Sequence, residues 1–352
     1  MKITALTDYK GYFGSKWDAI PYRSGMDKDK IAAYFAENSY QCAFKKFEQV
    51  NLGEVKEGDL IIYSSTEDSD YRYKSFIEDI VLSIELSGAL VIPKFVNLRA
   101  TNNKVMMELL KNIVIPEQAK HLPTLYFGAL NKNGIKELQY PLVVKAAGGA
   151  GSKFVFLAHN FKELIKRVKD VSYSSNISLN IKEKIRLLIH KGYYPESKYR
   201  NKFIIQKYIA NLQNDWKVLV FGKKYFVLMR YNRKNDFRAS GSGNFIFPSE
   251  LPAGLLDFCQ YIFEKLGVPN VSLDIAFDGE KFLLIEFQAI FFGSYTLTKS
   301  KYYFTMHENR WEKNYGEIEL EKIYVESIIN FIEQKKIEIN APKYTFYWGN
   351  DR

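Results

Sequence analysis

The fold of this chain is best predicted from Val271 to Gly293, which read VSLDIAFDGEKFLLIEFQAIFFG. Two apolar runs meet at Asp278-Gly279, a dipeptide typical of tight hairpin turns. Asp274 falls in the first predicted strand, while Glu286 and Gln288 fall two apart in the second and therefore share one face. A pairing that places Asp274 opposite this face would gather three oxygen ligands of the kind that Mg²⁺ takes. An ordinary amphipathic hairpin with solvated acids would show the same pattern, so both interpretations stay open.

A second informative segment combines a lysine with a loop of small residues. The residues from Tyr140 to Val155, YPLVVKAAGGAGSKFV, predict an apolar strand that ends at Lys145, a Gly/Ala/Ser loop and a further apolar run. Small residues let backbone N–H groups close over phosphates, and a lysine can meet the phosphate charge. The loop is not a P-loop, because Phe154 follows Lys153 where that motif requires Ser or Thr. A plain flexible turn is the alternative.

Three later segments carry groups that could recognise a nucleotide. Phe203 to Ile209, FIIQKYI, predicts a buried strand with a polar end, and Asp215 to Gly222, DWKVLVFG, predicts a strand entered through an acid. A strand edge can bind an adenine ring through its backbone, and a nearby carboxylate can accept from ribose hydroxyls. Leu228 to Phe245 then carries arginines at positions 230, 233 and 238 before a Gly-rich turn. Arginine suits phosphate or carboxylate, although a solvated basic loop would look the same.

The order of these segments resembles the ATP-grasp superfamily. It is most similar to the branch of glutathione synthetases and of the ligases that add glutamate to a ribosomal protein. The resemblance runs from about Leu98 to about Ser294. It rests, in chain order, on Lys104 in a predicted helix, Lys145 with its loop, Gln206 to Ile209, Asp215, Arg230, Arg238, Asp274, Glu286 and Gln288.

The resemblance implies an α/β fold in which two α+β subdomains clamp ATP, preceded by an N-terminal parallel sheet. The expected domains are an N-terminal βαβ domain at 1–97, a subdomain with the lid and the Gly-rich loop at 98–210, and a C-terminal core subdomain at 211–352. The implied ATP-binding residues are Lys104, Lys145, Gly148, Gly149, Gly151, Ser152, Gln206, Lys207, Tyr208, Ile209, Asp215 and Lys217. The implied metal ligands are Asp274, Glu286 and Gln288, and the implied catalytic residues are Arg230 and Arg238.

The implied activity is the joining of a carboxylate to an amine. ATP phosphorylates the carboxylate, and the amine then displaces phosphate from the acylphosphate, which leaves an amide, ADP and phosphate. Mg²⁺, expected as two ions and replaceable by Mn²⁺, and an arginine would neutralise the phosphoryl oxygens. The expected substrates are a small or polymer-linked carboxylate and an amine, with a role in modifying a surface polysaccharide or peptide as a further expectation.

Three positions depart from the nearest branch. Gln288 stands where Asn is usual, Lys217 where Arg is usual, and Ala289 to Gly293 where a small residue and Pro-Gly are common. Glutamine at position 288 still offers an amide oxygen, so metal binding is retained in principle. The change at Ala289 to Gly293 concerns the acceptor pocket instead. The departure at position 288 leaves open a non-catalytic ATP-binding regulator or scaffold.

The composition agrees with a cytoplasmic enzyme. Hydrophobic residues make up 47% of the 352, which excludes wholesale disorder and suffices for two or three domains. We expect no secretory signal, and no apolar run approaches the length of a membrane span. The net charge of +10 fits a basic cleft for ATP, and no motif predicts nucleic-acid binding. Cys42 and Cys259 are expected to be free thiols, and the oligomeric state is open, with a homodimer as one possibility.

The N-terminal part predicts a parallel βαβ sheet. Strands are expected at Lys2–Thr7, Asp59–Ser64 and Ala89–Ile92, and helices at Asp27–Asn38, capped by Asp27, and at Lys74–Leu86. Ligands gather at the carboxyl ends of such strands, where the loops Asp8–Met26 and Thr66–Tyr73 occur. The candidate substrate-binding residues in these loops are Tyr22, Arg23, Asp68, Asp70 and Arg72. A pair of solvated loops is the alternative interpretation.

The remaining segments allow one rival function and predict further helices. Asp68-Ser69-Asp70 follows a strand and could hold the metal of a nucleotide-sugar glycosyltransferase, so nucleotide preference would distinguish the two enzyme classes. Helices are expected at Phe161–Val171 and Ile181–Lys191, where a clamp fold has its lid. Another helix is expected at Glu319–Gln334.

Overall fold

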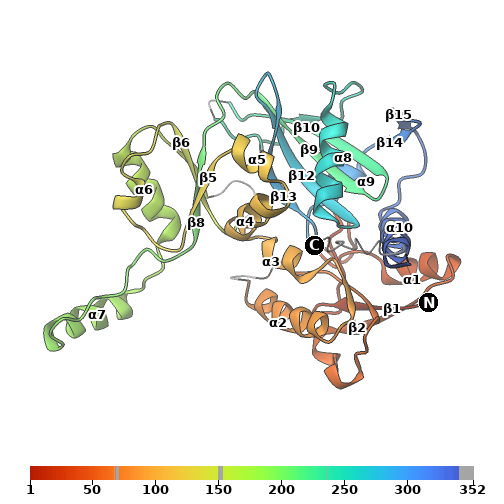
Figure 1. Cartoon of the computed structure of the whole chain (residues 1–352), viewed down its shortest axis with the longest axis horizontal. Helices are drawn as coiled ribbons and strands as arrows, with labels where there is room; N and C mark the ends of the chain where they lie inside the picture. The colour runs from red at the N-terminus through yellow and green to blue at the C-terminus, as the bar shows by residue number, and fades with distance from the viewer. Residues whose placement is uncertain (67, 69–70, 150–153, 235, 341–352) are drawn as a thin grey trace, which may run out of the picture.

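Three β-sheets form the framework of the described part of the protein (Figure 1). The computed structural model describes residues 1–66, 68, 71–149, 154–234 and 236–340, with side chains described up to residue 335. Three predicted site residues, Asp70, Gly151 and Ser152, lie outside the described residues. The mixed α/β architecture confirms the fold class predicted from the sequence.

The N-terminal sheet is parallel and has the strand order β2-β1-β3-β4. Its elements are β1 (Lys2–Thr7), α1 (Lys28–Glu37), β2 (Gln41–Lys46), short 3-10 turns at Phe47–Gln49 and Leu52–Glu54, β3 (Leu60–Tyr63), α2 (Arg72–Leu86) and β4 (Leu90–Ile92). Asp27 caps α1 as predicted, because its carboxylate accepts from the backbone N–H groups of Asp29 and Lys30. The sequence prediction missed β2, an edge strand that has no buried residue and no two-residue alternation of burial.

The small antiparallel sheet has the order β5-β8-β6-β7. Its elements are β5 (Thr124–Phe127), a 3-10 turn at Asn133–Ile135, β6 (Leu142–Ala146), β7 (Val155–Ala158), α6 (Phe161–Ser172), α7 (Ile177–Ile189) and β8 (Phe203–Lys207). Leu164 and Val168 of α6 pack onto this sheet. Helix α7 begins four residues before its predicted start, because Asn176 caps it by accepting from the backbone N–H of Leu179.

The large sheet has the order β13-β12-β9-β10-β14-β15, with β11 paired to β10. Its strands are β9 (Asn214–Phe221), β10 (Lys224–Tyr231), β11 (Phe245–Ile246), β12 (Asn270–Phe277), β13 (Phe282–Gln288), β14 (Tyr303–His307) and β15 (Arg310–Asn314). The helices that accompany it are α3 (Phe95–Ala100), α4 (Lys104–Val114), α5 (Pro116–His121), α8 (Leu255–Leu266) and α9 (Tyr295–Thr298). The sequence prediction had no strand at β14 or β15 and no helix at α8.

Strand β9 lies between two hydrophobic cores. Val218 and Val220 belong to a core that includes buried residues of α4 and α8. Leu219 and Phe221, on the opposite face, belong to a core shared with the N-terminal sheet and with α10 (Leu320–Asn340). This alternation joins the large sheet to the N-terminal part.

Two expectations from composition can be compared with the fold. No helix within the described ranges combines the length and the apolar character that a membrane crossing requires. Cys259 is buried and Cys42 is half-buried, and both are free thiols as predicted.

Candidate active site

A cleft of about 1310 Å³ lies between the two antiparallel sheets and is bounded on one side by the loop that follows β1. The small sheet contributes β6 and β8, and the large sheet contributes β9, β10, β12 and β13. The predicted site residues that line the cleft are Arg23, Asp68, Lys104, Lys145, Gly148, Gly149, Gln206, Lys207, Tyr208, Ile209, Asp215, Lys217, Arg230, Arg238, Asp274, Glu286 and Gln288. The fold therefore collects residues from the whole length of the resemblance into one place.

Two lysines reach the cleft from different elements. Lys104 begins α4, and its backbone N–H donates to the carbonyl oxygen of Ala147 at 2.8 Å. Its Nζ lies 3.3 Å from the carbonyl oxygen of Gly149 and 3.5 Å from Glu286 Oε1. Lys145 of β6 is buried and donates from Nζ to Gln206 Oε1 at 2.6 Å. Two neighbouring ammonium groups suit an anionic phosphate chain.

A chain of buried polar contacts orients Lys145. The amide nitrogen of Gln206 donates to Thr124 Oγ1 at 3.0 Å and to Glu108 Oε1 at 3.4 Å, so the amide oxygen faces Lys145. Glu108 forms an ion pair with Lys111, and each side chain is only 1% exposed. Burial lowers the pKa of Lys145 to about 8, although Glu286 and Glu108 oppose the shift. The sequence prediction missed this network. The pattern that indicates it is the pair Glu108 and Lys111, which lie three residues apart on α4 and can form an ion pair.

The predicted hairpin has the register needed for a metal site. Asp274 on β12 pairs with Glu286 on β13, and Ser272 pairs with Gln288. The register shifts between Asp274 and Ile275, so the acids lie at an irregularity of the ladder, a position at which strands commonly redirect side chains. Gln288 Nε2 donates to Glu286 Oε1 at 3.0 Å.

Arg230 connects two aspartates that line the cleft. Its Nε and Nη2 donate to the two carboxylate oxygens of Asp215 at 2.7 and 2.8 Å, and Nη2 lies 2.9 Å from Asp274 Oδ2. Lys217 Nζ donates to Ser272 Oγ at 2.8 Å and lies 3.4 Å from Asp274 Oδ1. Burial favours a higher pKa for Asp274, but Arg230 and Lys217 outweigh it and hold that pKa well below its usual range. Asp215, predicted to bind ribose, and Arg230, predicted beside the phosphate, thus belong to one ion network.

The residues present fit Mg²⁺. Asp274 stays ionised, Glu286 lies opposite it, and three cationic side chains already surround the two acids, which shows that the site attracts positive charge. Within the described residues there is no cluster of three or more His, Cys, Asp or Glu side chains that could hold a metal. The amide oxygen of Gln288 would therefore be the third protein ligand, and Mg²⁺ commonly completes one or two carboxylates with water and phosphate oxygens.

The side of the cleft where the sequence predicted the adenine ring combines the end of β8 with the loop after β10. The ring of Tyr208 lies 6.1 Å from that of Phe237, measured between centroids. Arg238, next in sequence, donates from Nε to Asp236 Oδ1 at 2.9 Å and from Nη1 to the carbonyl oxygen of Val155 at 3.2 Å. The backbone N–H of Lys207 already donates to Pro123, so this donor is engaged within the protein.

The structure divides the predicted substrate-binding residues into two groups. Arg23 and Asp68 line the cleft, and Asp68 accepts from the backbone N–H of Tyr73 at 3.0 Å. The guanidinium of Arg23 lies 5.3 Å from the ring centre of Tyr22. Tyr22 is 78% exposed and Arg72 is an exposed residue at the start of α2, and neither is among the residues that line the cleft.

An aromatic wall lines the cleft near the N-terminal loop and was missing from the predicted residues. Tyr295 contacts Trp17 edge to face with centroids 4.9 Å apart, and contacts Phe245 at 5.3 Å. The backbone N–H of Trp17 donates to Ser294 Oγ at 2.9 Å, which fixes the loop to the large-sheet side. The aromatic richness of residues 8–26 was the signal for Trp17, whereas Phe245 and Tyr295 carry no distinctive pattern.

Comparison with known proteins identifies the fold. Neither a protein-family model nor a curated protein sequence matches this chain. The crystal structure of the D-cycloserine synthetase DcsG matches with a TM-score of 0.54 and 10% identity, over 93% of this chain and 98% of that chain. The macrocyclase MdnC of Microcystis aeruginosa MRC, bound with the precursor peptide MdnA, matches with a TM-score of 0.50 and 10% identity, over 94% of this chain and 100% of that chain. Both structures are ATP-grasp proteins, and this chain has the ATP-grasp fold.

Proposed function

We propose that this chain is an ATP-dependent ligase that joins a carboxylate to an amine through an acylphosphate and releases ADP and phosphate. The observation that carries the proposal is the approach of Lys104 Nζ to within 3.5 Å of Glu286 inside the cleft, because a cation suited to phosphate then lies beside an acid suited to a metal ion. The fold shared with a D-cycloserine synthetase and a macrocyclase supports the same class of reaction by analogy.

The proposed chemistry assigns separate tasks to the two sides of the cleft. Lys104 and Lys145 would bind the phosphate chain of ATP and hold the terminal phosphate toward the carboxylate substrate. The carboxylate oxygen attacks that phosphate, ADP leaves, and the amine nitrogen then attacks the acyl carbon and expels phosphate. Mg²⁺, held by Asp274, Glu286 and Gln288, would neutralise charge on the phosphate oxygens. Arg230 would keep Asp274 ionised and correctly placed.

The N-terminal side of the cleft is the proposed place for the carboxylate or the amine. Arg23 supplies a guanidinium there and Asp68 a carboxylate, so the two together could distinguish an acid from an amine. An Arg23→Ala variant should raise KM for one substrate without changing KM for ATP.

The test is ADP and phosphate release from Mg·ATP in the presence of pools of amino acids, small amines, hydroxy acids and uronic acids. Release should require both a carboxylate and an amine, and Glu286→Gln should lower it by about 100-fold or more because the metal loses a charged ligand. Glu264→Gln, on the exposed face of α8, is the matched control and should leave the rate unchanged.

Other outcomes would replace the proposal. Binding of ATP with no release in any pool would favour the non-catalytic regulator that the departure at Gln288 leaves open. Preference for a UDP- or GDP-sugar over ATP would favour the glycosyltransferase interpretation of Asp68. Failure to bind ATP at all would remove the nucleotide assignment of Lys104 and Lys145.

A further inference from the structure

Helix α7 and the segment that returns from it form an arm that projects from the small sheet (Figure 1). We define the arm as residues 174–200. The two ends of the arm are joined to each other, because Ser174 N–H donates to the carbonyl oxygen of Lys198 at 2.9 Å and Arg200 N–H donates to Ser174 Oγ at 3.1 Å. The arm is therefore a folded unit with one end attached to the body of the molecule.

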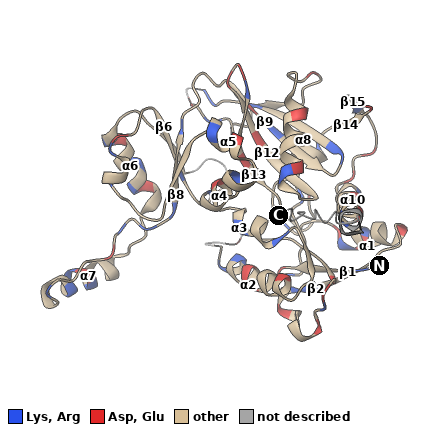
Figure 2. Ribbon diagram, viewed as in Figure 1, with Lys and Arg blue, Asp and Glu red and all other residues tan. Residues whose placement is uncertain are grey.

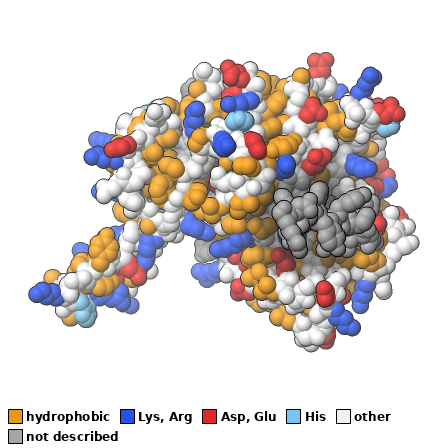
Figure 3. All heavy atoms as spheres, in the orientation of Figure 1, with side chains coloured by type: hydrophobic (Ala, Val, Ile, Leu, Met, Phe, Trp, Pro, Cys, Tyr) orange, Lys and Arg blue, Asp and Glu red, His pale blue; other side chains and the backbone are white. Residues whose placement is uncertain are grey.

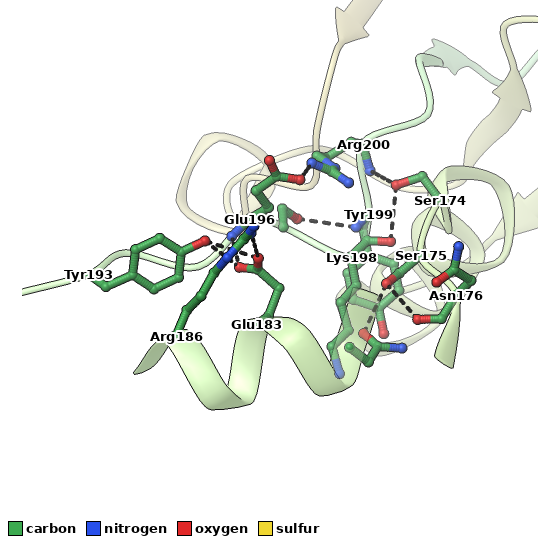
Figure 4. A network of polar contacts seen from close by, with 12 residues as sticks. Ser174, Ser175, Asn176, Glu183, Arg186, Tyr193, Glu196, Lys198, Tyr199 and Arg200 are labelled. Atoms are coloured by element: carbon green, nitrogen blue, oxygen red, sulfur yellow. Dashed lines mark hydrogen bonds and ion pairs between the residues drawn. The ribbon is translucent and has the colours of Figure 1, made fainter. Parts of the chain in front are cut away.

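A polar network fixes which face of α7 points inward (Figure 4). Glu183 is the buried residue of the helix, and its carboxylate accepts from Tyr193 Oη at 2.8 Å, Arg186 Nη1 at 2.6 Å and the backbone N–H of Glu196 at 2.9 Å. The hydrogen bond from Tyr193 and the contact with Arg186 lower the pKa of Glu183, so its charge is retained and neutralised within the arm. The inward face of α7 is thus polar, the reverse of an ordinary amphipathic helix.

The opposite face of α7 presents an aliphatic stripe to solvent. Its members recur every three to four residues, which places them on one side of the helix. They are Ile177, Ile181, Ile185, Leu188 and Ile189, with exposed fractions of 80, 54, 48, 87 and 68%. The space-filling view shows hydrophobic and basic side chains together on the arm (Figure 3). An exposed run of large aliphatic chains on a protruding helix marks an interaction surface.

The positive charge of α7 favours an anionic partner. The exposed charged side chains of α7 are Lys182, Lys184 and Arg186, and all are cationic (Figure 2). At 100° per residue, Lys182 and Lys184 fall on opposite flanks of the aliphatic stripe. A second copy of this arm would bring like charges together, whereas an anionic surface would be attracted to both flanks. A single convex helix also offers no groove for a peptide, but it can lie flat on a lipid surface.

We propose that α7 is a membrane-surface anchor that inserts its aliphatic stripe at the headgroup level of an anionic bilayer, with the flanking lysines on the lipid headgroups. The 13 residues of α7 span roughly 20 Å, which suits a helix that lies in the plane of the surface. Tyr194, just beyond the helix, is 91% exposed and adds an amphipathic ring to the surface of the arm. This inference is independent of the ligase chemistry, since the arm contributes no residue to the cleft.

The experiment is co-sedimentation of the full chain with vesicles of phosphatidylglycerol and phosphatidylcholine in equal parts, compared with vesicles of phosphatidylcholine alone. We expect binding to the anionic vesicles that weakens as salt is raised. The double variant Ile181→Glu/Leu188→Glu should weaken it by about 100-fold or more, because two aliphatic chains leave the lipid. The matched control is Leu187→Glu/His190→Glu, which adds two glutamates at exposed positions that lie on the opposite side from the stripe at 100° per residue, and it should retain the binding.

Three results would overturn the proposal. The first is an absence of binding to anionic vesicles at low salt. The second is equal loss of binding in the stripe variant and in its charge-matched control, which would reduce the effect to electrostatics. The third is retention of an acidic protein, instead of vesicles, in a manner that depends on the stripe. Unchanged circular dichroism and unchanged ATP binding would establish that both variants fold.

Discussion

The cleft and the α7 arm differ in which residues they bury and which they expose. In the cleft, Arg230 is enclosed by Asp215 and Asp274. The buried Glu108, which contacts the cleft residue Gln206, is enclosed with Lys111. On the arm, the stripe of five aliphatic residues is exposed while Glu183 is buried. A buried charge without its partner is strongly destabilising, whereas exposed aliphatic chains cost the isolated protein little. The comparison therefore predicts that substitutions in the cleft change folding and turnover, and that substitutions in the stripe change association alone.

The largest expected effect comes from Arg230→Met. This change leaves Asp215 and Asp274 without the guanidinium that bridges them, with only Lys217 beside Asp274, and we expect the free energy of unfolding to fall by about 3–5 kcal/mol. Chemical denaturation measures the loss. Arg310→Met on the exposed start of β15 is the control and should change stability by less than about 0.5 kcal/mol. Equal values for the two variants would show that the buried network stabilises no more than a surface arginine does.

The next effect concerns the ion pair on α4. Glu108→Gln leaves the ammonium of Lys111 buried without its carboxylate, so stability should fall by about 3 kcal/mol. It should also raise KM for ATP, because Glu108 helps to orient Gln206 toward Lys145. Adding Lys111→Met should recover stability and leave the KM effect in place. Recovery of both properties would mean that Glu108 has no orienting role.

A smaller effect is expected from pH. Since burial lowers the pKa of Lys145 to about 8, its ammonium is lost as pH rises through that value, and ATP affinity should fall about tenfold between about pH 7 and about pH 9. The affinity of Lys145→Arg should stay level over this range, since arginine remains charged. Stability should respond with the opposite sign: between about 8 and 10.5 the unfolded chain holds the proton that Lys145 lacks when folded, so stability rises with pH. Equilibrium binding and thermal denaturation over this range measure the two responses.

The smallest effect is expected on the arm. Ile181→Glu/Leu188→Glu should change the free energy of unfolding by less than about 0.5 kcal/mol and should leave ADP release unchanged, because these side chains are exposed. A loss of several kcal/mol would contradict the comparison, since it would show that the stripe supports the fold. Thermal denaturation without lipid is the measurement.

The two regions also differ in how well the sequence predicts them. The hairpin that carries Asp274 and Glu286 was predicted correctly, because a turn dipeptide and a two-residue period are local signals. The Arg230–Asp215 pair was not predicted, although the two residues lie directly opposite in the β9–β10 ladder. That relation depends on strand register, which a list of motifs does not contain.

The errors in secondary structure have a related cause. Strand β2 and the hairpin of β14 and β15 contain a single buried residue, Phe304, so their sequences lack the buried face that would reveal a strand. On the arm, the periodic aliphatic residues correctly predicted a helix. An apolar period of this kind usually marks the face of a helix that packs inward. In α7 the hydrogen bonds that Glu183 accepts from Tyr193 and Arg186 lie on the inward side instead, and the aliphatic face is exposed. Periodicity shows which residues share one face of a helix, whereas the contacts of the helix determine whether that face points inward or toward solvent.

The position of β9 between two cores has a consequence for how the protein unfolds. Because Val218 and Val220 pack on one side while Leu219 and Phe221 pack on the other, separation of the N-terminal sheet would expose half of the strand that carries Asp215 and Lys217. The N-terminal sheet and the large sheet should therefore open as one cooperative unit, and amide hydrogens of β9 should exchange only in globally unfolded molecules. Deleting the first 97 residues would then unfold the cleft itself, so the smallest fragment that keeps the cleft includes the N-terminal sheet and α10.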